Sequence, residues 1–333
     1  LLAEAISMTQ PLRIGVLGCA RIARKRVIPA IQASEGAEMV AIASQRPGVA
    51  AECAAEASIP TAYDTYADLL ADPTVEAVYI PASGEAHSPL TLAAARAGKH
   101  VLCEKPLATS VAEADEMAAA CRQAGVILQE AFMWRHHPRT QLTQELIADG
   151  AIGDVRQINV SFSFQLDPSD WRMKPQRGGG AMWDLGCYGV DATRHFTSDE
   201  PVEVYARGHF SESGIDLSMQ AALRFPNNVL ANLDCSFETI WRSRLELIGT
   251  AGRIEWRTAF QHWDPTIRLF RSSDWQAEPE VIACEDLNQY ECQIRMFAAS
   301  VRAGVLLSPA EDGTANMRVM QQVYEQALSS RAE

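Results

Sequence analysis

Hydrophobic residues in the first part of the chain form short runs separated by stretches with helical spacing. The apolar runs cover residues 12–17, 39–43, 75–80, 100–103 and 126–129. The helix-favouring stretches between them cover residues 22–33, 48–57, 87–97 and 111–124. Repeated strand–helix units of this kind predict a parallel sheet with helices on its faces.

After about residue 150 the pattern changes to longer runs in which apolar and polar residues alternate. These runs cover residues 156–164, 202–210, 217–225, 229–237 and 244–256. Alternation over consecutive strands predicts a large, mostly antiparallel sheet, and two helical stretches at 289–303 and 313–329 close the chain. We therefore predict two domains, an α/β domain over residues 9–131 and an α+β domain over residues 132–333.

A glycine-containing loop follows the first predicted strand. It reads Gly15-x-x-Gly18-x-Ala20-x-x-Ala23 and leads into the first predicted helix. Small residues at this place let backbone N–H groups and a helix N-terminus approach a pyrophosphate. A plain tight turn is the alternative interpretation, because alanine replaces two of the three glycines of the usual motif. The strand–helix–strand context favours a dinucleotide site made by Gly18, Cys19, Ala20, Arg21 and Ile22.

The end of the second predicted strand distinguishes between the two nicotinamide cofactors. An acidic residue there would bind the ribose 2′-hydroxyl of NAD, but this chain reads Ser44-Gln45-Arg46. A hydroxyl and a guanidinium suit a 2′-phosphate instead, so these residues favour NADP and leave NAD possible. A solvated turn before a helix is the simpler alternative.

Lys105 is one of only four lysines in the chain, and it follows the apolar run at 100–103. Ligands of open α/β sheets bind in the crevice outside the carboxyl ends of the strands. A compact ammonium at that place can polarise a substrate oxygen or lower the pKa of a neighbour. Lys105 is therefore the first catalytic candidate, although a strand-end lysine in a surface salt bridge would look the same.

Composition narrows the class of protein further. The chain is 47% hydrophobic and 21% charged, with a net charge of −13, which is unfavourable for binding nucleic acid or anionic membranes. It has no run of 18 apolar residues and no basic segment ahead of a leader-like stretch, so we expect a cytoplasmic protein. The eight cysteines show no metal-site spacing, and we expect neither a metal nor disulfides.

Three segments of the sequence resemble the family of glucose–fructose oxidoreductase, inositol dehydrogenase and rhizopine-catabolism proteins. They are residues 18–23 (GCARIA), 98–106 (GKHVLCEKP) and 178–188 (GGGAMWDLGCY). The resemblance is strongest to the branch with xylose dehydrogenases, dimeric dihydrodiol dehydrogenase and nucleotide-sugar 3-ketoreductases. It implies an N-terminal Rossmann domain followed by the mostly antiparallel α+β domain.

The same resemblance implies roles for individual residues. Lys105 would touch the substrate hydroxyl and the nicotinamide ribose, Tyr188 would donate or accept the proton, and Asp184 would orient Tyr188 or a sugar hydroxyl. An ammonium beside a tyrosine favours its phenolate form, which agrees with a proton relay. Without the resemblance, a core tyrosine with a satisfied hydroxyl would be the commoner interpretation of Tyr188.

Further residues are weaker candidates. Trp171 and Arg172 resemble a family segment that lines the sugar site, where an indole and a guanidinium suit ring faces and hydroxyls. Ser83 and His87 follow the third strand of the first domain and are expected beside the cofactor, as is Glu104. The loop departs here from the usual family sequence and reads Ala82-Ser83-Gly84-Glu85-Ala86-His87.

The sequence thus predicts a cytoplasmic NADP-dependent oxidoreductase that acts on an aldose or a keto-sugar. A dinucleotide-binding sensor without turnover is the alternative, although retention of Lys105 and Tyr188 favours an enzyme. We also expect a homodimer or homotetramer through the C-terminal sheet, because such a sheet has one face free to pair. The residues expected at that interface are Phe162, Phe164, Leu233 and Phe237.

Overall fold

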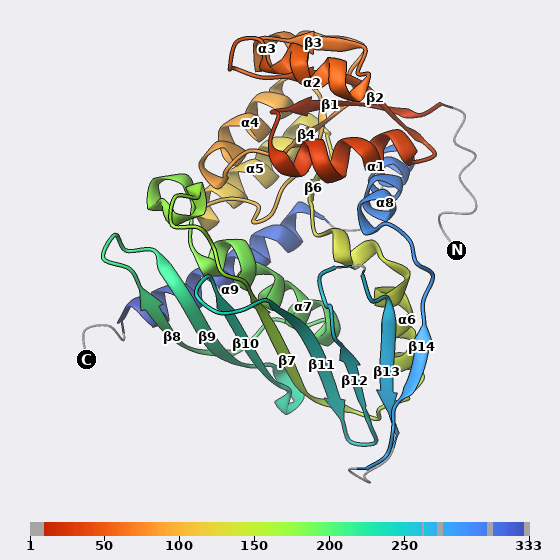
Figure 1. The fold of residues 1–333 in the computed structure, drawn as a ribbon, viewed down its shortest axis with the longest axis vertical. Helices are drawn as coiled ribbons and strands as arrows, with labels where there is room; N and C mark the ends of the chain where they lie inside the picture. Colours follow the sequence, from red (N-terminus) through yellow and green to blue (C-terminus); the bar gives the residue numbers. More distant parts are fainter. Residues whose placement is uncertain (1–9, 262, 272–275, 305–308, 330–333) are drawn as a thin grey trace. The chain divides into compact units, whose positions relative to one another are not determined.

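The computed structural model describes residues 10–261, 263–271, 276–304 and 309–329. The chain folds into two compact units, shown in Figure 1. One unit contains Leu1–Met133 and Asn288–Thr314, and the other contains Trp134–Leu287 and Ala315–Glu333. The described residues 288–304 and 309–314, which the sequence pattern assigns to the second domain, therefore group with the first unit.

The first unit is built on a six-stranded parallel sheet with the strand order β3-β2-β1-β4-β5-β6. Its strands are β1 Leu12–Leu17, β2 Ala37–Ala43, β3 Thr61–Tyr63, β4 Ala77–Ile80, β5 His100–Cys103 and β6 Leu128–Glu130. The order reverses between β1 and β4, and such a switch point is where open α/β sheets bind their ligands. The predicted parallel sheet is confirmed.

Local sequence explains where two helices of the first unit begin. A π-helical turn, η1 Ala23–Val27, runs into α1 Ile28–Ala33. The further helices are α2 Val49–Ala57, α3 Tyr66–Ala71, α4 Gly84–Arg96 and α5 Val111–Ala124. Thr65 and Ser110 cap α3 and α5 by accepting backbone N–H groups, which satisfies donors that have no partner inside a helix.

Helix α8, Gln289–Ala303, belongs to the core of the first unit although it lies near the end of the chain. Its residues Ile294, Phe297 and Ala298 are buried in the same hydrophobic cluster as Leu12 and Ile14 of β1. Burying these side chains supplies apolar contact that α1 alone does not give. The first unit is therefore completed by a segment far away in the sequence.

The second unit is built on an eight-stranded sheet with the order β14-β13-β12-β11-β7-β10-β9-β8. Its strands are β7 Val155–Ser163, β8 Glu203–Phe210, β9 Asp216–Arg224, β10 Leu230–Ser236, β11 Arg242–Gly249, β12 Arg253–Trp256, β13 Thr266–Phe270 and β14 Glu280–Ala283. All neighbouring strands are antiparallel except β10 and β7, which are parallel. The predicted large, mostly antiparallel sheet is confirmed.

Helical segments cover one face of this sheet. A π-helical turn, η5 Met182–Gly186, continues into α7 Cys187–Thr197, and both contact β7 and β10. The remaining α-helices of the unit are α6 Pro138–Ala148 and the greater part of α9 Ala310–Ser329. Short 3₁₀ turns are η2 Met133–His136, η3 Trp171–Met173, η4 Pro175–Arg177 and η6 Pro226–Asn228.

The side chains expected at a subunit interface lie on the covered face of the sheet, so that part of the prediction is wrong. Phe162, Leu233 and Phe237 are buried within the unit, and Phe164 packs between the two phenylalanines. Strand alternation puts them beneath the helices, and a Cβ at Gly189 of α7 would lie 3.0 Å from Leu233. Self-association itself remains a prediction, and it would have to use other residues.

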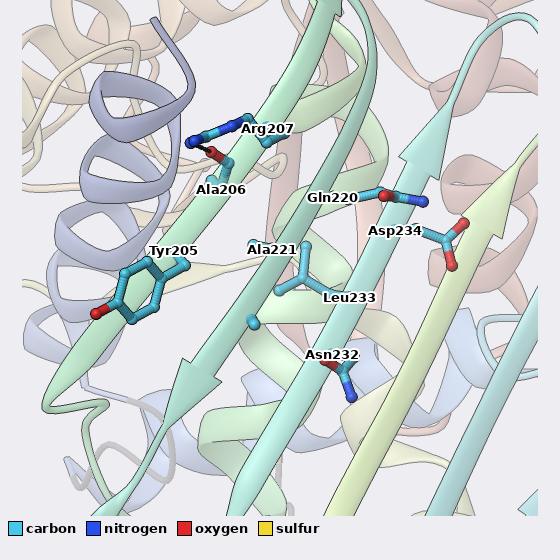
Figure 2. A pocket seen from close by; sticks show the side chains of 9 residues that line it. Tyr205, Ala206, Arg207, Gln220, Ala221, Asn232, Leu233 and Asp234 are labelled. Atoms are coloured by element: carbon cyan, nitrogen blue, oxygen red, sulfur yellow. Dashed lines mark hydrogen bonds between the residues drawn. The ribbon is translucent and has the colours of Figure 1, made fainter. Parts of the chain in front are cut away.

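The open face of the sheet carries mostly polar side chains. A shallow groove of about 510 Å³ runs over β8, β9 and β10. Figure 2 shows the side chains that line it, among them Tyr205, Arg207, Gln220, Asn232 and Asp234. Tyr205 is 65% exposed, and we propose that the predicted self-association uses this open face.

Candidate active site

The glycine loop after β1 has the backbone geometry that the sequence predicts. Gly18 has φ +130°, a conformation that favours glycine, and a Cβ there would meet Pro81 Cγ and the Tyr66 hydroxyl, both at 3.7 Å. Gly15 leaves room for Leu69 of α3, which would lie 2.8 Å from a Cβ. Ala20 to Ile22 lead directly into η1. The loop therefore allows a close approach to backbone N–H groups at a helix start.

The residues after β2 lie beside this loop. Ser44 is buried, and its hydroxyl accepts the N–H of Arg46 at 3.2 Å, whereas Gln45 and Arg46 are exposed. The charges of Arg46 and Arg24 both act on the Cys19 thiol, whose pKa burial raises to about 12. Arg24 also forms an ion pair with Glu56 of α2. Two guanidinium groups thus lie close to the glycine loop.

Arg24 is a candidate cofactor residue that the sequence analysis missed. It lies one helical turn after Ala20, and its N–H donates to the Ala20 carbonyl at 3.1 Å. The signal in the sequence was the run Arg24-Lys25-Arg26, which puts cations at the start of a helix where anions are usually preferred. A cationic first turn beside a glycine loop suits a ligand that carries phosphates.

Glu104 and Lys105 follow β5, at the edge of the sheet where its other strands also end. The Glu104 carboxylate accepts the hydroxyl of the fully buried Tyr79 at 2.6 Å. Burial and the Glu104 charge raise the pKa of Tyr290 to about 12, while the Lys105 charge acts in the opposite direction. Tyr290 belongs to α8, so this late helix brings a phenol close to the Glu104–Lys105 pair.

His87 connects two loops at this edge. Its ring is 1% exposed, with Nδ1 2.9 Å from the Pro106 carbonyl and Nε2 3.0 Å from the Ala82 carbonyl. Burial lowers its pKa, so the ring is neutral at physiological pH. His87 therefore supports the Lys105 loop from behind, and its expected contact with the cofactor stays a prediction. Ser83 is half-buried, and its hydroxyl donates to Glu85 at 2.8 Å.

Tyr188 lies in the second unit, at the first turn of α7. It is 5% exposed, with its ring 5.4 Å from that of Phe162 and 4.8 Å from that of Phe260. The two neighbouring rings fix the orientation of the phenol by edge and tilted contacts. The ring is therefore held rigidly, as a positioned acid or base requires.

Asp184, Arg172 and Trp171 come together near the start of the same helical segment. Arg172 Nε lies 3.2 Å from Asp184 Oδ2, and the guanidinium lies 5.5 Å from the centre of the Trp171 ring. Asp170 also lies 3.6 Å from the guanidinium. A carboxylate, a guanidinium and an indole in one group can hydrogen-bond hydroxyls and cover a ring face.

The glycine run at 178–180 is explained by close backbone packing. A Cβ at Gly179 would collide with the Arg172 carbonyl, and one at Gly180, with φ +124°, would collide with the Asp216 carboxylate. Asp216 is 1% exposed and accepts the Met182 N–H at 2.5 Å, at the start of the segment that carries Asp184 and Tyr188. Burial raises the pKa of Asp216 to about 7. The sequence analysis missed this residue.

His136 and His137, which are adjacent in the sequence, have structural roles. His137 Nδ1 accepts the Arg139 N–H at 3.1 Å and caps α6, and burial lowers the pKa of His136 to about 4. Within the described ranges no group of three or more His, Cys, Asp or Glu side chains is arranged to hold a metal ion. The same part of the chain contains no helix with the length and apolar character needed to cross a membrane.

A nucleotide-binding parallel-sheet unit joined to an antiparallel-sheet unit with a buried tyrosine defines a two-domain dinucleotide-dependent class of protein. Residues 12–132 match the family model described as "Oxidoreductase family, NAD-binding Rossmann fold", and residues 140–255 match the GFO/IDH/MocA C-terminal domain. The chain belongs to the GFO/IDH/MocA oxidoreductase family. The predicted family, its oxidoreductase class and its N-terminal Rossmann domain are confirmed.

Three similar proteins agree with this assignment. D-xylose 1-dehydrogenase (NADP(+)) 2 of Haloferax volcanii is 39% identical over 327 residues, covering 96% of this chain and 98% of its own. A solved aldose-aldose oxidoreductase from Caulobacter crescentus, complexed with glycerol, has a TM-score of 0.90 at 28% identity and covers 97% and 99% of the two chains. A 3-ketoreductase from Actinomadura kijaniata, in complex with NADP and TDP-benzene, has a TM-score of 0.86 at 31% identity and covers 95% and 98%.

Proposed function

We propose that this protein is an NADP-dependent oxidoreductase that transfers hydride between nicotinamide and a sugar carbon, acting as an aldose dehydrogenase or a keto-sugar reductase. The observation that carries the proposal is Lys105 just after β5, held beside Glu104 and Tyr290 in a Rossmann unit whose loop keeps Gly18 at a positive φ. The xylose dehydrogenase and the 3-ketoreductase among the similar proteins support both the cofactor and the sugar class.

The residues present fit NADP. Gly18 allows close approach of the loop to a pyrophosphate, and Ser44 with Arg46 suits a 2′-phosphate at the end of β2. Arg24 adds a second cation near the same loop. A carboxylate at the position of Ser44 to Arg46 would favour NAD, and none is found there.

The bound nicotinamide supplies the hydride chemistry, and the protein has to move a proton. We assign that proton to the Tyr188 hydroxyl, whose ring Phe162 and Phe260 hold in place. Lys105 is assigned to the substrate oxygen and the nicotinamide ribose, where its ammonium favours the phenolate form of a nearby tyrosine. The same pair serves oxidation and reduction, because the proton moves in opposite directions in the two reactions.

The group around Arg172 is assigned to the sugar. Asp184 accepts hydroxyl protons and the Arg172 guanidinium donates, while the Trp171 ring covers an apolar ring face. Such a group holds a polyol better than an apolar carbonyl compound. Sugar binding is therefore the substrate class that this part of the second unit favours.

The cofactor part of the proposal is tested by following absorbance at the NADPH band. The protein is offered NADP or NAD with a panel of aldoses, and NADPH with keto-sugars. We expect turnover that prefers NADP, and we expect Arg46→Ala to lower that preference by roughly ten- to a hundredfold, as a charge-assisted phosphate contact implies. Arg122→Ala is the matched control, because Arg122 is an exposed arginine on α5 paired with Glu311. Tight NADPH binding without any turnover would instead indicate a sensor.

A further inference from the structure

A buried arginine organises the segment between β12 and β13. Arg139 is 2% exposed, and its guanidinium stacks 4.3 Å from the Trp256 ring. It donates hydrogen bonds to four backbone carbonyls of the segment, those of Thr258 at 3.0 Å, Ala259 at 2.8 Å, Gln261 at 3.3 Å and Asp264 at 2.8 Å. Burying a guanidinium is costly, and these hydrogen bonds offset that cost while they hold the described residues of the loop in place.

The loop presents one aromatic residue to the interior and another to solvent. Phe260 is fully buried, donates its N–H to Ser243 Oγ at 3.1 Å, and lies 4.8 Å from Tyr188. Trp263 is 62% exposed, three residues further on. The segment that fixes the candidate proton donor therefore also fixes an exposed indole.

Trp263 lies against a second exposed tryptophan. The rings of Trp263 and Trp241 are 5.7 Å apart with an interplanar angle of 31°, and Trp241 is 42% exposed. Trp241 precedes β11, and the carbonyl of Ile240 accepts the Ser163 hydroxyl at 2.9 Å. Ser163 follows Phe162, whose ring touches Tyr188. Trp241 thus lies at the end of the sheet where Phe162 of β7 contacts Tyr188 of α7, and Trp263 lies against it.

We propose that Trp241 and Trp263 form a stacking platform for a second ring that is attached to the reacting sugar. The inference rests on the proposed function, and it extends the substrate class from single sugars to sugars that carry a further ring.

Two features favour a ring as the occupant. A contiguous exposed apolar patch marks a binding site more often than a single exposed residue does, and two tilted indoles in contact offer apolar faces together with N–H donors at their edges. A pyranose and a nucleobase share the chemistry that fits, a flat or chair-shaped apolar face with polar edges. A platform that is already rigid also avoids an ordering cost when a ligand binds.

The test compares ligands with one ring and with two rings on the NADPH-loaded protein, in which an aldose cannot be oxidised. Calorimetry measures the affinities of glucose, cellobiose and TDP-glucose for the parent protein and for Trp241→Ala, Trp263→Ala and Trp263→Phe. The cellobiose and TDP-glucose measurements distinguish a second sugar from a nucleobase. Val281→Ala is the matched control, because Val281 is an exposed apolar residue on β14, away from the two indoles.

The expected result has three parts. At least one ligand with two rings binds the parent more tightly than glucose does. Each alanine variant then loses roughly five- to tenfold of that affinity, while glucose binding is unchanged, and Trp263→Phe keeps most of the affinity. Val281→Ala behaves like the parent in all three titrations.

Two results would overturn the platform. One is an equal loss of affinity for ligands with one and with two rings, and the other is a parent that binds neither cellobiose nor TDP-glucose better than glucose. Sedimentation of the same variants distinguishes ligand binding from self-association. If the two tryptophans formed a subunit interface, their replacement would change the sedimenting mass and leave the ratio of two-ring to one-ring ligand affinities unchanged. Turnover of simple sugars tests the proposed function alone. The stacking platform and the proposed function can therefore be refuted independently of each other.

Discussion

Replacing Asp216 with asparagine should remove a pH dependence from the stability of the protein. The Asp216 carboxyl is 1% exposed and accepts the Met182 N–H at the start of the segment that carries Tyr188. Burial raises its pKa from 3.8 to about 7, although the backbone hydrogen bonds act in the opposite direction. The folded protein therefore holds a proton on Asp216 at a pH where the unfolded chain has lost it.

The sign and the size of the effect on stability follow from this pKa shift. A raised pKa in the folded state contributes stability that is fully present below about pH 4 and is lost as the pH rises through about 7. With about 1.4 kcal/mol for each tenfold change in acidity constant, the parent loses about 4 kcal/mol from this group over that window. Asparagine does not titrate, so Asp216→Asn should lack this loss.

The assay is urea unfolding of the parent and Asp216→Asn at several pH values from 4.5 to 8. The difference in unfolding free energy between the two proteins should shift in favour of the variant by about 3 kcal/mol between pH 4.5 and 8. Asp167→Asn is the control, because Asp167 is exposed and its pKa is lowered by hydrogen bonds from Ser169. Parallel pH profiles for the parent and Asp216→Asn would refute the reasoning.

Two other predictions concern the second unit. Arg139→Met should lower the unfolding free energy by roughly 2–5 kcal/mol, because four backbone carbonyls lose their hydrogen-bond donor. Arg156→Met, which removes an exposed ion pair with Asp154, should cost less than about 1 kcal/mol. Urea unfolding measures both changes. In sedimentation the parent should be a dimer or tetramer and Tyr205→Asp should shift it towards monomer, and a parent that sediments as a monomer would contradict the proposed open-face interface.

The regular elements were the most predictable part of the fold. The ranges 12–17, 100–103, 111–124 and 289–303 coincide with β1, β5, α5 and α8, because each has a clear period or a cap. Elements that were not predicted are short or lack a simple pattern, among them β3, α3, β13 and β14. The stretch at 244–256 was predicted as one strand and is two, because the turn at 250–252 separates β11 from β12.

The candidate site was predictable at strand ends and less so elsewhere. The positions of Gly18, Ser44 and Lys105 follow from parallel-strand topology, which a sequence pattern can reveal. Asp216 and Arg139 act on residues far away in the sequence, so no local period points to them. The covered face of the second sheet could not be chosen either, because alternation defines two faces without saying which one the helices cover.

Turnover by Lys105→Met and Tyr188→Phe is the most direct test of the proposed proton relay. With the best sugar and saturating NADP, each variant should lose at least about a hundredfold in kcat, as removal of a positioned proton donor or its partner implies. NADPH affinity, measured by fluorescence titration, should stay near the parent value for Tyr188→Phe. Tyr324→Phe, another tyrosine of the second unit, should keep full activity. Retention of kcat within about threefold in Tyr188→Phe would contradict the relay.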